Sequence, residues 1–186
     1  MSATNRGAIR VESDFYVTPE KTIHNFFDQY GDISGTILEP SAGNGNFLKV
    51  IKERQPFNWM TGVELRSEEK NNLEKYSDKV IIGDFLSLNF DYDQFDYIIG
   101  NPPYSLAIEF LEKCFSMCSS TNTTIIMLLR TAFLESKKRY DFWQRHPVNH
   151  LYILSERPSF TGKGTDATSY SFFIWDNSKQ QSIHVI

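Results

Sequence analysis

The chain has 186 residues, which is enough for a substantial hydrophobic core and is most economically one domain. Its net charge of −4 argues against a general polyanion-binding tail but does not exclude a local basic surface. No apolar run is long enough to span a membrane, and the amino terminus carries no apolar signal segment, so we expect a cytoplasmic protein. Cys114 and Cys118 lack the spacing of a zinc or dithiol motif and are expected to be reduced core thiols, with no metal site.

The hydrophobic pattern alternates between helices and strands along the chain. Residues 1–13 are small and polar and are expected to be a mobile arm before a single domain over 14–186. A first helix is predicted to begin at Thr18-Pro19-Glu20, with the threonine hydroxyl as its cap, and to stop at Gly31-Asp32. Strands are predicted over 36–39, 59–64, 79–82, 95–100 and 123–129, and helices over 46–54, 67–76, 106–117 and 132–145.

Two closing strands are predicted over 150–155 and 169–175, and they should pair antiparallel because no helix lies between them. The whole pattern predicts an α/β fold: a three-layer sandwich with a mostly parallel, seven-stranded Rossmann-like sheet that ends in an antiparallel hairpin.

The stretch Asn101-Pro102-Pro103-Tyr104 follows the fourth predicted strand. Neither proline can donate a backbone hydrogen bond, so the strand must end there in a stiff, extended loop. This loop places an amide and an aromatic ring at the carboxyl edge of the sheet, where ligands bind in open α/β folds. By itself the motif could equally be a rigid turn.

Three acidic residues fall at the carboxyl ends of the first three predicted strands: Glu39, Glu64 and Asp84. Parallel strands would bring all three to the edge that carries the proline loop. A glycine-containing loop, Pro40-Ser41-Ala42-Gly43-Asn44-Gly45, follows the first acid and would let its backbone approach a ligand closely. An acid at this position disfavours a polyphosphate, and no P-loop lysine is present. A ligand with a ribose and a cationic part, such as S-adenosylmethionine, fits better than a dinucleotide.

With these residues, the sequence resembles the adenine-N6 DNA methyltransferases that use S-adenosylmethionine, in the order with the cofactor loop before the catalytic loop. The resemblance covers most of the chain, from Phe15 to Trp175. It implies that the amino-terminal element Phe15-Tyr16-Val17-Thr18-Pro19 wraps the methionine end of the cofactor, with Tyr16, Thr18 and Pro19 among the cofactor-binding residues. The loop from Glu39 to Gly45 would hold the methionyl part, through Glu39, Pro40, Ser41, Ala42, Gly43 and Gly45. Glu64 would bind the ribose hydroxyls, Asp84 the adenine amino group, and Phe85 would flank the adenine ring.

The resemblance also assigns the catalytic loop. Asn101, Pro102, Pro103 and Tyr104 would hold the target adenine, with the Asn101 side-chain oxygen and the Pro102 carbonyl accepting the two hydrogens of the exocyclic nitrogen. This arrangement favours a lone pair that points at the methyl group and needs no strong base. Tyr104 would stack on the base, which must leave the duplex to reach the pocket.

DNA is the expected partner, and the segment from Arg130 to Lys163 has seven basic and three acidic residues. Phe160 is the candidate for the second face of the flipped base, and Lys163 for a phosphate; Phe160 could equally pack a surface hairpin. Lys137, Lys138 and Arg139 could lie on the DNA backbone or simply be solvated. Few residues remain for a target-recognition region, so we expect that short loops, a homodimer or a partner subunit supply sequence specificity, or that specificity is relaxed.

Two other interpretations remain open from the sequence. The same loop chemistry suits RNA adenine or a protein glutamine amide, both of which present a planar amino group. A methyltransferase-like scaffold without activity is the non-enzymatic alternative, although both Asn101 and the glycine loop are present.

Overall fold

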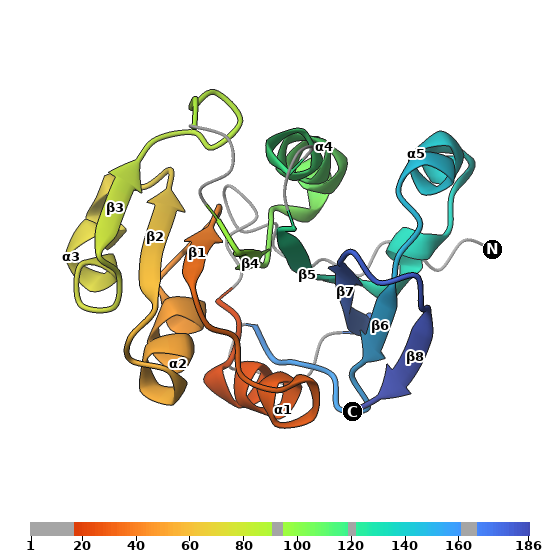
Figure 1. Ribbon diagram of the computed structural model, residues 1–186, viewed down its shortest axis with the longest axis horizontal. Coiled ribbons are helices and arrows are strands. Elements are labelled where there is room, and N and C mark those ends of the chain that lie inside the picture. The colour runs from red at the N-terminus through yellow and green to blue at the C-terminus, as the bar shows by residue number, and fades with distance from the viewer. Residues whose placement is uncertain (1–16, 91–94, 119–121, 161–166) are drawn as a thin grey trace.

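The computed structural model describes residues 17–90, 95–118, 122–160 and 167–186, and the structural statements below concern these residues. A single twisted sheet forms the centre of the molecule (Figure 1). Its strands are β1 (Thr36–Glu39), β2 (Trp59–Glu64), β3 (Lys79–Ile82), β4 (Tyr97–Gly100), β5 (Thr124–Arg130), β6 (His150–Ile153), β7 (Tyr170–Trp175) and β8 (Ser182–Val185). Their spatial order is β3-β2-β1-β4-β5-β7-β6-β8.

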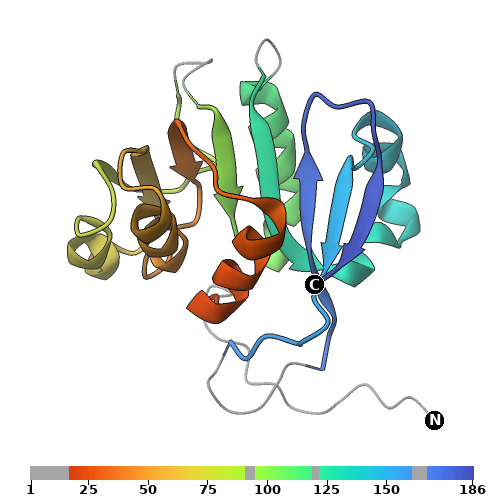
Figure 2. The ribbon, with the colours of Figure 1, turned by 60° about the horizontal axis from the view of Figure 1, so that its bottom comes forward.

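The helices cover both faces of this sheet, as Figures 1 and 2 show. The α-helices are α1 (Glu20–Tyr30), α2 (Asn46–Arg54), α3 (Lys70–Leu73), α4 (Ala107–Met117) and α5 (Tyr140–Arg145). Short 3-10 helices are η2 (Ser67–Glu69), η3 (Tyr104–Leu106), η4 (Thr131–Leu134) and η5 (Lys137–Arg139). None of the helices in the described ranges has the length and apolarity to cross a membrane.

Alternating residues of β7 show how one strand serves two cores. Phe172 belongs to the core under α1 and α2, where its ring lies 4.1 Å from that of Phe26. Phe173, the next residue, belongs to the core under α4 and α5 with Phe110 and Phe142. Successive side chains of a strand point to opposite faces, so a strand buried on both sides is apolar throughout. The predicted three-layer α/β sandwich is therefore confirmed.

The parallel and antiparallel parts of the sheet also agree with the sequence. Strands β3, β2, β1, β4 and β5 pair in parallel, and β7 pairs antiparallel with both β5 and β6. The predicted count of seven strands is wrong, because β8 adds an eighth strand, parallel to β6. Its exposed Ile183 and Val185 leave it without the buried apolar pattern that would have indicated a strand.

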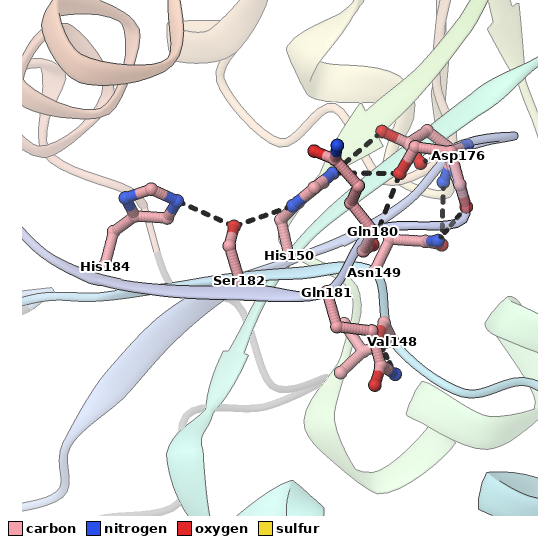
Figure 3. A network of polar contacts seen from close by, with 9 residues as sticks. Val148, Asn149, His150, Asp176, Gln180, Gln181, Ser182 and His184 are labelled. Atoms are coloured by element: carbon pink, nitrogen blue, oxygen red, sulfur yellow. Dashed lines mark hydrogen bonds and ion pairs between the residues drawn. The ribbon is translucent and has the colours of Figure 1, made fainter.

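A polar network attaches β8 to the sheet (Figure 3). The Ser182 hydroxyl lies 2.8 Å from His150 Nδ1 and 2.7 Å from His184 Nε2, while His150 Nε2 lies 3.1 Å from Asp176 Oδ2. The His184 ring stacks on Tyr152 at 4.4 Å. These residues lie at the starts of β6 and β8 and the end of β7, which is the sheet edge opposite the Asn101 loop. Hydrogen bonds thus hold a strand that buries little apolar surface.

Two predicted helices are shorter than expected. The segment 67–76 forms only η2 and α3, and the segment 132–145 is broken into η4, η5 and α5. The break is at Ser136, whose φ of 111° is incompatible with a helix. Side chains bind the carbonyl groups that a continuous helix would have used: Trp143 Nε1 donates to Phe133 O (3.3 Å), and Arg139 Nη1 donates to Glu135 O (2.7 Å).

The start of α1 also differs from the prediction. Pro19 is the N-cap and no side chain caps the helix, so Thr18 is not the cap. Thr18 is buried, and its hydroxyl accepts a hydrogen bond from Asn101 Nδ2 at 3.1 Å. The hydroxyl is therefore used for a contact with the catalytic loop instead of the first turn.

Candidate active site

The ends of four neighbouring parallel strands bring the predicted site residues to one edge of the sheet. Glu39 ends β1, Glu64 ends β2, Asp84 follows β3, and Asn101 follows β4. Because β3, β2, β1 and β4 are adjacent and parallel, all four side chains line one cleft, whose volume including its open mouth is about 840 Å³.

The glycine loop after β1 has the backbone that only glycine adopts without strain. Gly43 has φ 55° and Gly45 has φ 88°, and Gly45 is the N-cap of α2. A side chain at Gly45 would also come within 3.1 Å of Leu73. Gly45 shapes the loop and does not line the cleft, whereas Gly43 does.

Glu39 is a buried acid at the floor of the cleft, with 2% of its surface exposed. Its Oε2 atom is buried and accepts no hydrogen bond from any residue that the structure describes. Burial, and secondarily the charge of Glu64, raise the pKa of this carboxyl well above its ordinary value. A buried carboxylate with an unsatisfied oxygen is a ready acceptor for a cationic, hydrogen-bonding ligand group.

Glu64 is engaged by the protein itself. Its Oε2 accepts the Gly43 N–H at 2.8 Å, and its Oε1 accepts both the Arg66 N–H at 3.0 Å and Arg66 Nε at 2.9 Å. The carboxylate thus joins the glycine loop to the turn after β2. The next residue, Leu65, lines the cleft with 61% of its surface exposed.

Asp84, after β3, forms part of the cleft wall. Its Oδ1 accepts the Leu86 N–H at 3.0 Å and its Oδ2 accepts the Ser87 hydroxyl at 2.8 Å, so it closes a tight turn. Phe85 is buried at the cleft wall against Phe110, with ring centroids 5.1 Å apart.

Lys113 of α4 binds the backbone of this turn. Its ammonium donates to the carbonyls of Phe85, Leu86 and Leu88, the second at 3.1 Å, and lies 4.9 Å from the Phe85 ring centroid. The role of Lys113 could not be predicted from the sequence, since its contacts join α4 to a loop far away in the chain.

The side-chain amide nitrogen of Asn101 points toward Thr18 and donates a hydrogen bond to Thr18 Oγ1. The Asn101 backbone carbonyl accepts the Ser41 hydroxyl at 3.2 Å, which ties the proline loop to the glycine loop.

Tyr104 begins η3 on the other side of the loop from the cleft. Its ring lies 5.6 Å from Tyr170, and the Arg130 guanidinium lies 5.0 Å from its centroid. Burial raises the pKa of the Tyr104 hydroxyl well above its ordinary value, so the group is neutral. Phe160 also packs against Tyr170, at 5.0 Å. Tyr104 and Phe160 thus share one aromatic neighbour.

The structure brings most of the predicted cofactor residues together. The cleft is lined by Thr18, Glu39, Pro40, Ser41, Ala42, Gly43, Glu64, Asp84, Phe85, Asn101 and Pro103. Pro19, Gly45 and Pro102 support it without lining it, and Tyr16 and Lys163 lie outside the described residues. Cleft residues that the sequence analysis missed include Leu65, Arg66, Leu106 and Phe110. Leu65 and Leu106 could have been suspected from their positions beside Glu64 and Tyr104.

Comparison with known proteins identifies relatives by sequence. The chain is 30% identical over 149 residues to the type II methyltransferase M.CvrRI of Paramecium bursaria Chlorella virus XZ-6E, an alignment that covers 69% of this chain and 39% of the relative. It is 30% identical over 120 residues to the modification methylase CviBIII of Paramecium bursaria Chlorella virus NC1A, covering 52% of this chain and 31% of the relative. The chain therefore spans well under half of these relatives. No protein-family model matches it.

Solved structures share the fold. A proposed RNA methyltransferase from Pyrococcus horikoshii aligns with a TM-score of 0.66 at 16% identity, covering 94% of each chain. An S-adenosylmethionine-dependent O-methyltransferase from Thermotoga maritima aligns with a TM-score of 0.61 at 14% identity, covering 89% of this chain and 68% of that one. The plantazolicin methyltransferase BpumL, solved with S-adenosylhomocysteine, aligns at 0.57 and 15% identity, covering 86% and 82%. The predicted resemblance to S-adenosylmethionine-dependent methyltransferases is confirmed: the chain has their fold, and its curated relatives are a viral type II methyltransferase and a viral modification methylase.

Proposed function

We propose that this chain transfers a methyl group from S-adenosylmethionine to the exocyclic N6 amino group of adenine in DNA. The observation that carries the proposal is the single cleft that contains both the unsatisfied, buried carboxylate of Glu39 and the amide of Asn101. The first suits a cationic cofactor, and the second suits an amino-group acceptor.

The cleft residues fit the cofactor part by part. Glu39 Oε2 would accept hydrogen bonds from the methionyl ammonium, which would satisfy the buried oxygen. Glu64 and Asp84 would accept from the ribose hydroxyls and the adenine amino group. The apolar side chains of Leu65 and Phe85 would flank the adenine ring. When bound, the cofactor supplies an electrophilic methyl group attached to a positively charged sulfur.

The acceptor is positioned by the proline loop. Asn101 Oδ1 and the Pro102 carbonyl would accept the two hydrogens of the adenine amino group, which directs the nitrogen lone pair toward the cleft. The Asn101–Thr18 hydrogen bond supports this role, because it fixes the amide nitrogen away from the acceptor. Transfer would form the nitrogen–methyl bond as the methyl–sulfur bond breaks, with S-adenosylhomocysteine leaving and the extra proton on the nitrogen passing to water. Positioning and oriented acceptors would therefore provide the catalysis.

The flipped adenine would stack on Tyr104, whose ring is already held by Tyr170 and Arg130. Each stacked base contributes on the order of 1–3 kcal/mol. DNA is the proposed acceptor, and the curated relatives support it, since one is a type II methyltransferase and the other a modification methylase.

The proposal is tested by replacing Asn101 with alanine. We expect Asn101→Ala to lower kcat for DNA methylation by at least about 100-fold, as loss of one oriented catalytic hydrogen-bonding group does. Cofactor affinity measured by calorimetry should stay nearly the same, because Glu39, Glu64 and Asp84 are unchanged. Turnover in the mutant comparable to that of the original chain would refute the catalytic role of Asn101.

A further inference from the structure

A second hollow lies on the other side of the catalytic loop from the cofactor cleft. Its volume including its open mouth is about 880 Å³, and Tyr104, Ala107, Leu129, Arg130, Ser136 and Arg139 are among its lining residues. We call it the Arg139 recess. It shares no lining residue with the cleft, since Asn101, Pro103 and Leu106 line the cleft while Tyr104 and Ala107 line the recess. The recess is therefore on the acceptor side of the loop.

The recess is built on the irregular segment after β5. Arg130 ends β5 at the same sheet edge as Asn101, because β4 and β5 are parallel neighbours. Ser136 holds a φ of 111°, a conformation that is strained for a non-glycine residue. Such strain indicates that the shape of the recess is maintained against a local cost, which is common at binding sites.

The Arg139 side chain is held on one side of its guanidinium group, and its other nitrogen atoms remain available to a ligand. Its Nη1 donates to the carbonyls of Ala132 (3.4 Å) and Glu135 (2.7 Å), and its guanidinium lies 4.7 Å from the Phe133 ring centroid. Its Nε and Nη2 atoms have no acceptor among the residues that the structure describes. A guanidinium held on one side presents the other side to a ligand at low entropic cost.

The cations beside the recess lack acidic partners. Within the described ranges, the side chains of Lys137, Lys138 and Arg139 form no ion pair. By contrast, Arg54 binds Asp28 and Asp32, and Arg66 binds Glu64 and Glu69. One carboxylate, that of Glu135, also lines the recess, and Asp141 is nearby on α5. The local balance still favours an anionic ligand.

Apolar surface continues from the recess. A neighbouring hollow shares Ser136 with it and is lined by Leu134, Lys137, Tyr140 and Trp143. Leu134 is 42% exposed and Tyr140 is 62% exposed. Cations interleaved with exposed apolar and aromatic side chains are typical of surfaces that follow a nucleic-acid strand.

We propose that the Arg139 recess and its neighbouring surface bind the DNA strand next to the target nucleotide, with Arg139 on a backbone phosphate, Lys137 and Lys138 on following phosphates, and Tyr140 against an adjacent sugar or base. The inference rests on the proposed function, since it identifies the recess by its place beside the acceptor loop. A strand whose adenine reaches Tyr104 must pass this surface, because Tyr104 forms one wall of the recess. Phosphate contacts would position the strand without reading its sequence.

The test is fluorescence anisotropy with a labelled, adenine-containing DNA duplex over a series of salt concentrations. We expect the double variant Lys137→Gln/Lys138→Gln to weaken binding and to lower the slope of log affinity against log salt by about two, since each phosphate contact contributes about one. Arg139→Gln should lower it by about one. The double lysine variant keeps the test decisive if Arg139→Gln fails to fold, because neither lysine side chain makes an ion pair within the described residues.

The control is Lys79→Gln/Lys179→Gln, which removes the same charge from two exposed lysines outside the recess. It should bind DNA with the slope of the original chain. Equal slopes for the Lys137/Lys138 variant and the original chain would overturn the docking proposal, as would a loss confined to RNA of the same sequence with DNA binding unchanged. Failure of the original chain to methylate DNA would count against the proposed function alone, because the binding comparison needs no turnover.

Discussion

The two sides of the catalytic loop differ in how their charged groups are held. On the cofactor side, Glu64 and Asp84 are bound by backbone N–H groups and neighbouring side chains. On the other side, Lys137, Lys138 and Arg139 have no ion-pair partner within the described segments, and the backbone there is irregular at Ser136. The cleft is thus an organised site for a small ligand, while the recess is an open cationic surface.

If both proposals hold, one sheet edge serves two kinds of ligand. A small cofactor must be recognised group by group, so its acids are fixed before it binds. A nucleic-acid strand needs charge along a path, and flexible lysines provide that. Substitutions on each side of the loop, and the pH dependence of cofactor binding, test whether the two sides are separate.

Glu39→Gln should have the largest effect on cofactor binding. Removing one partner of a buried ion pair costs about 3–5 kcal/mol, so we expect affinity for S-adenosylmethionine to fall roughly 150-fold or more. The unliganded variant should also melt at a higher temperature at pH values above the raised pKa of Glu39, where the original chain carries a buried charge. Calorimetry and thermal denaturation measure both effects, and unchanged affinity would place the ammonium elsewhere.

The pH dependence follows from the same carboxyl. Its pKa is raised in the folded chain by burial and then by Glu64, so the stability that its neutral form contributes is complete below the ordinary glutamate pKa and is lost as pH rises through the raised value. Cofactor binding needs the ionised form and should strengthen over that same pH range. An affinity for S-adenosylmethionine that does not change with pH in the original chain would contradict this account.

Glu64→Ala should weaken cofactor binding by roughly 10- to 150-fold, because a charge-assisted hydrogen bond contributes about 1.5–3 kcal/mol. The variant also leaves the Gly43 N–H without its acceptor, which should loosen the glycine loop. DNA affinity should not change, since Glu64 lies across the loop from the recess. Equal losses for both ligands would mean that the two sides are not separate.

Lys113→Met should have a smaller effect, a several-fold rise in the KM for the cofactor with kcat nearly unchanged. Lys113 does not line the cleft, and it positions the turn that carries Asp84 and Phe85 through three carbonyls. Lys113→Arg, which keeps the donors, should restore part of the affinity. A fall in kcat without a change in KM would argue against this positioning role.

Ser136→Gly should have the smallest effect, and it is on stability. Glycine accepts the positive φ, which relieves strain, although it loses more entropy on folding than serine. We expect a net gain of about 1 kcal/mol, or roughly 2–4 °C in melting temperature for a chain of this size. A lower melting temperature would mean that the Ser136 hydroxyl, which accepts the Lys138 N–H, matters more than the strain.

The sequence predicted what depends on local pattern and on strand order. Glu39, Glu64, Asp84 and Asn101 could be placed together because parallel strands end at one edge, and the structure has them in one cleft. The hydroxyl of Thr18 was assigned to a helix cap because its true partner, Asn101, is distant in the chain. The break at Ser136 could not be foreseen either, since long-range donors such as Trp143 satisfy the carbonyls there. Strand β8 was missed because polar contacts, not buried apolar residues, hold it.

The central claim is tested most directly by identifying the methylated product. The chain would be incubated with methyl-labelled S-adenosylmethionine and, separately, DNA, RNA and a protein extract, and the labelled product would be digested and analysed by mass spectrometry. We predict N6-methyladenine from DNA. Label in cytosine, only in RNA, or only in glutamine of protein would contradict the account.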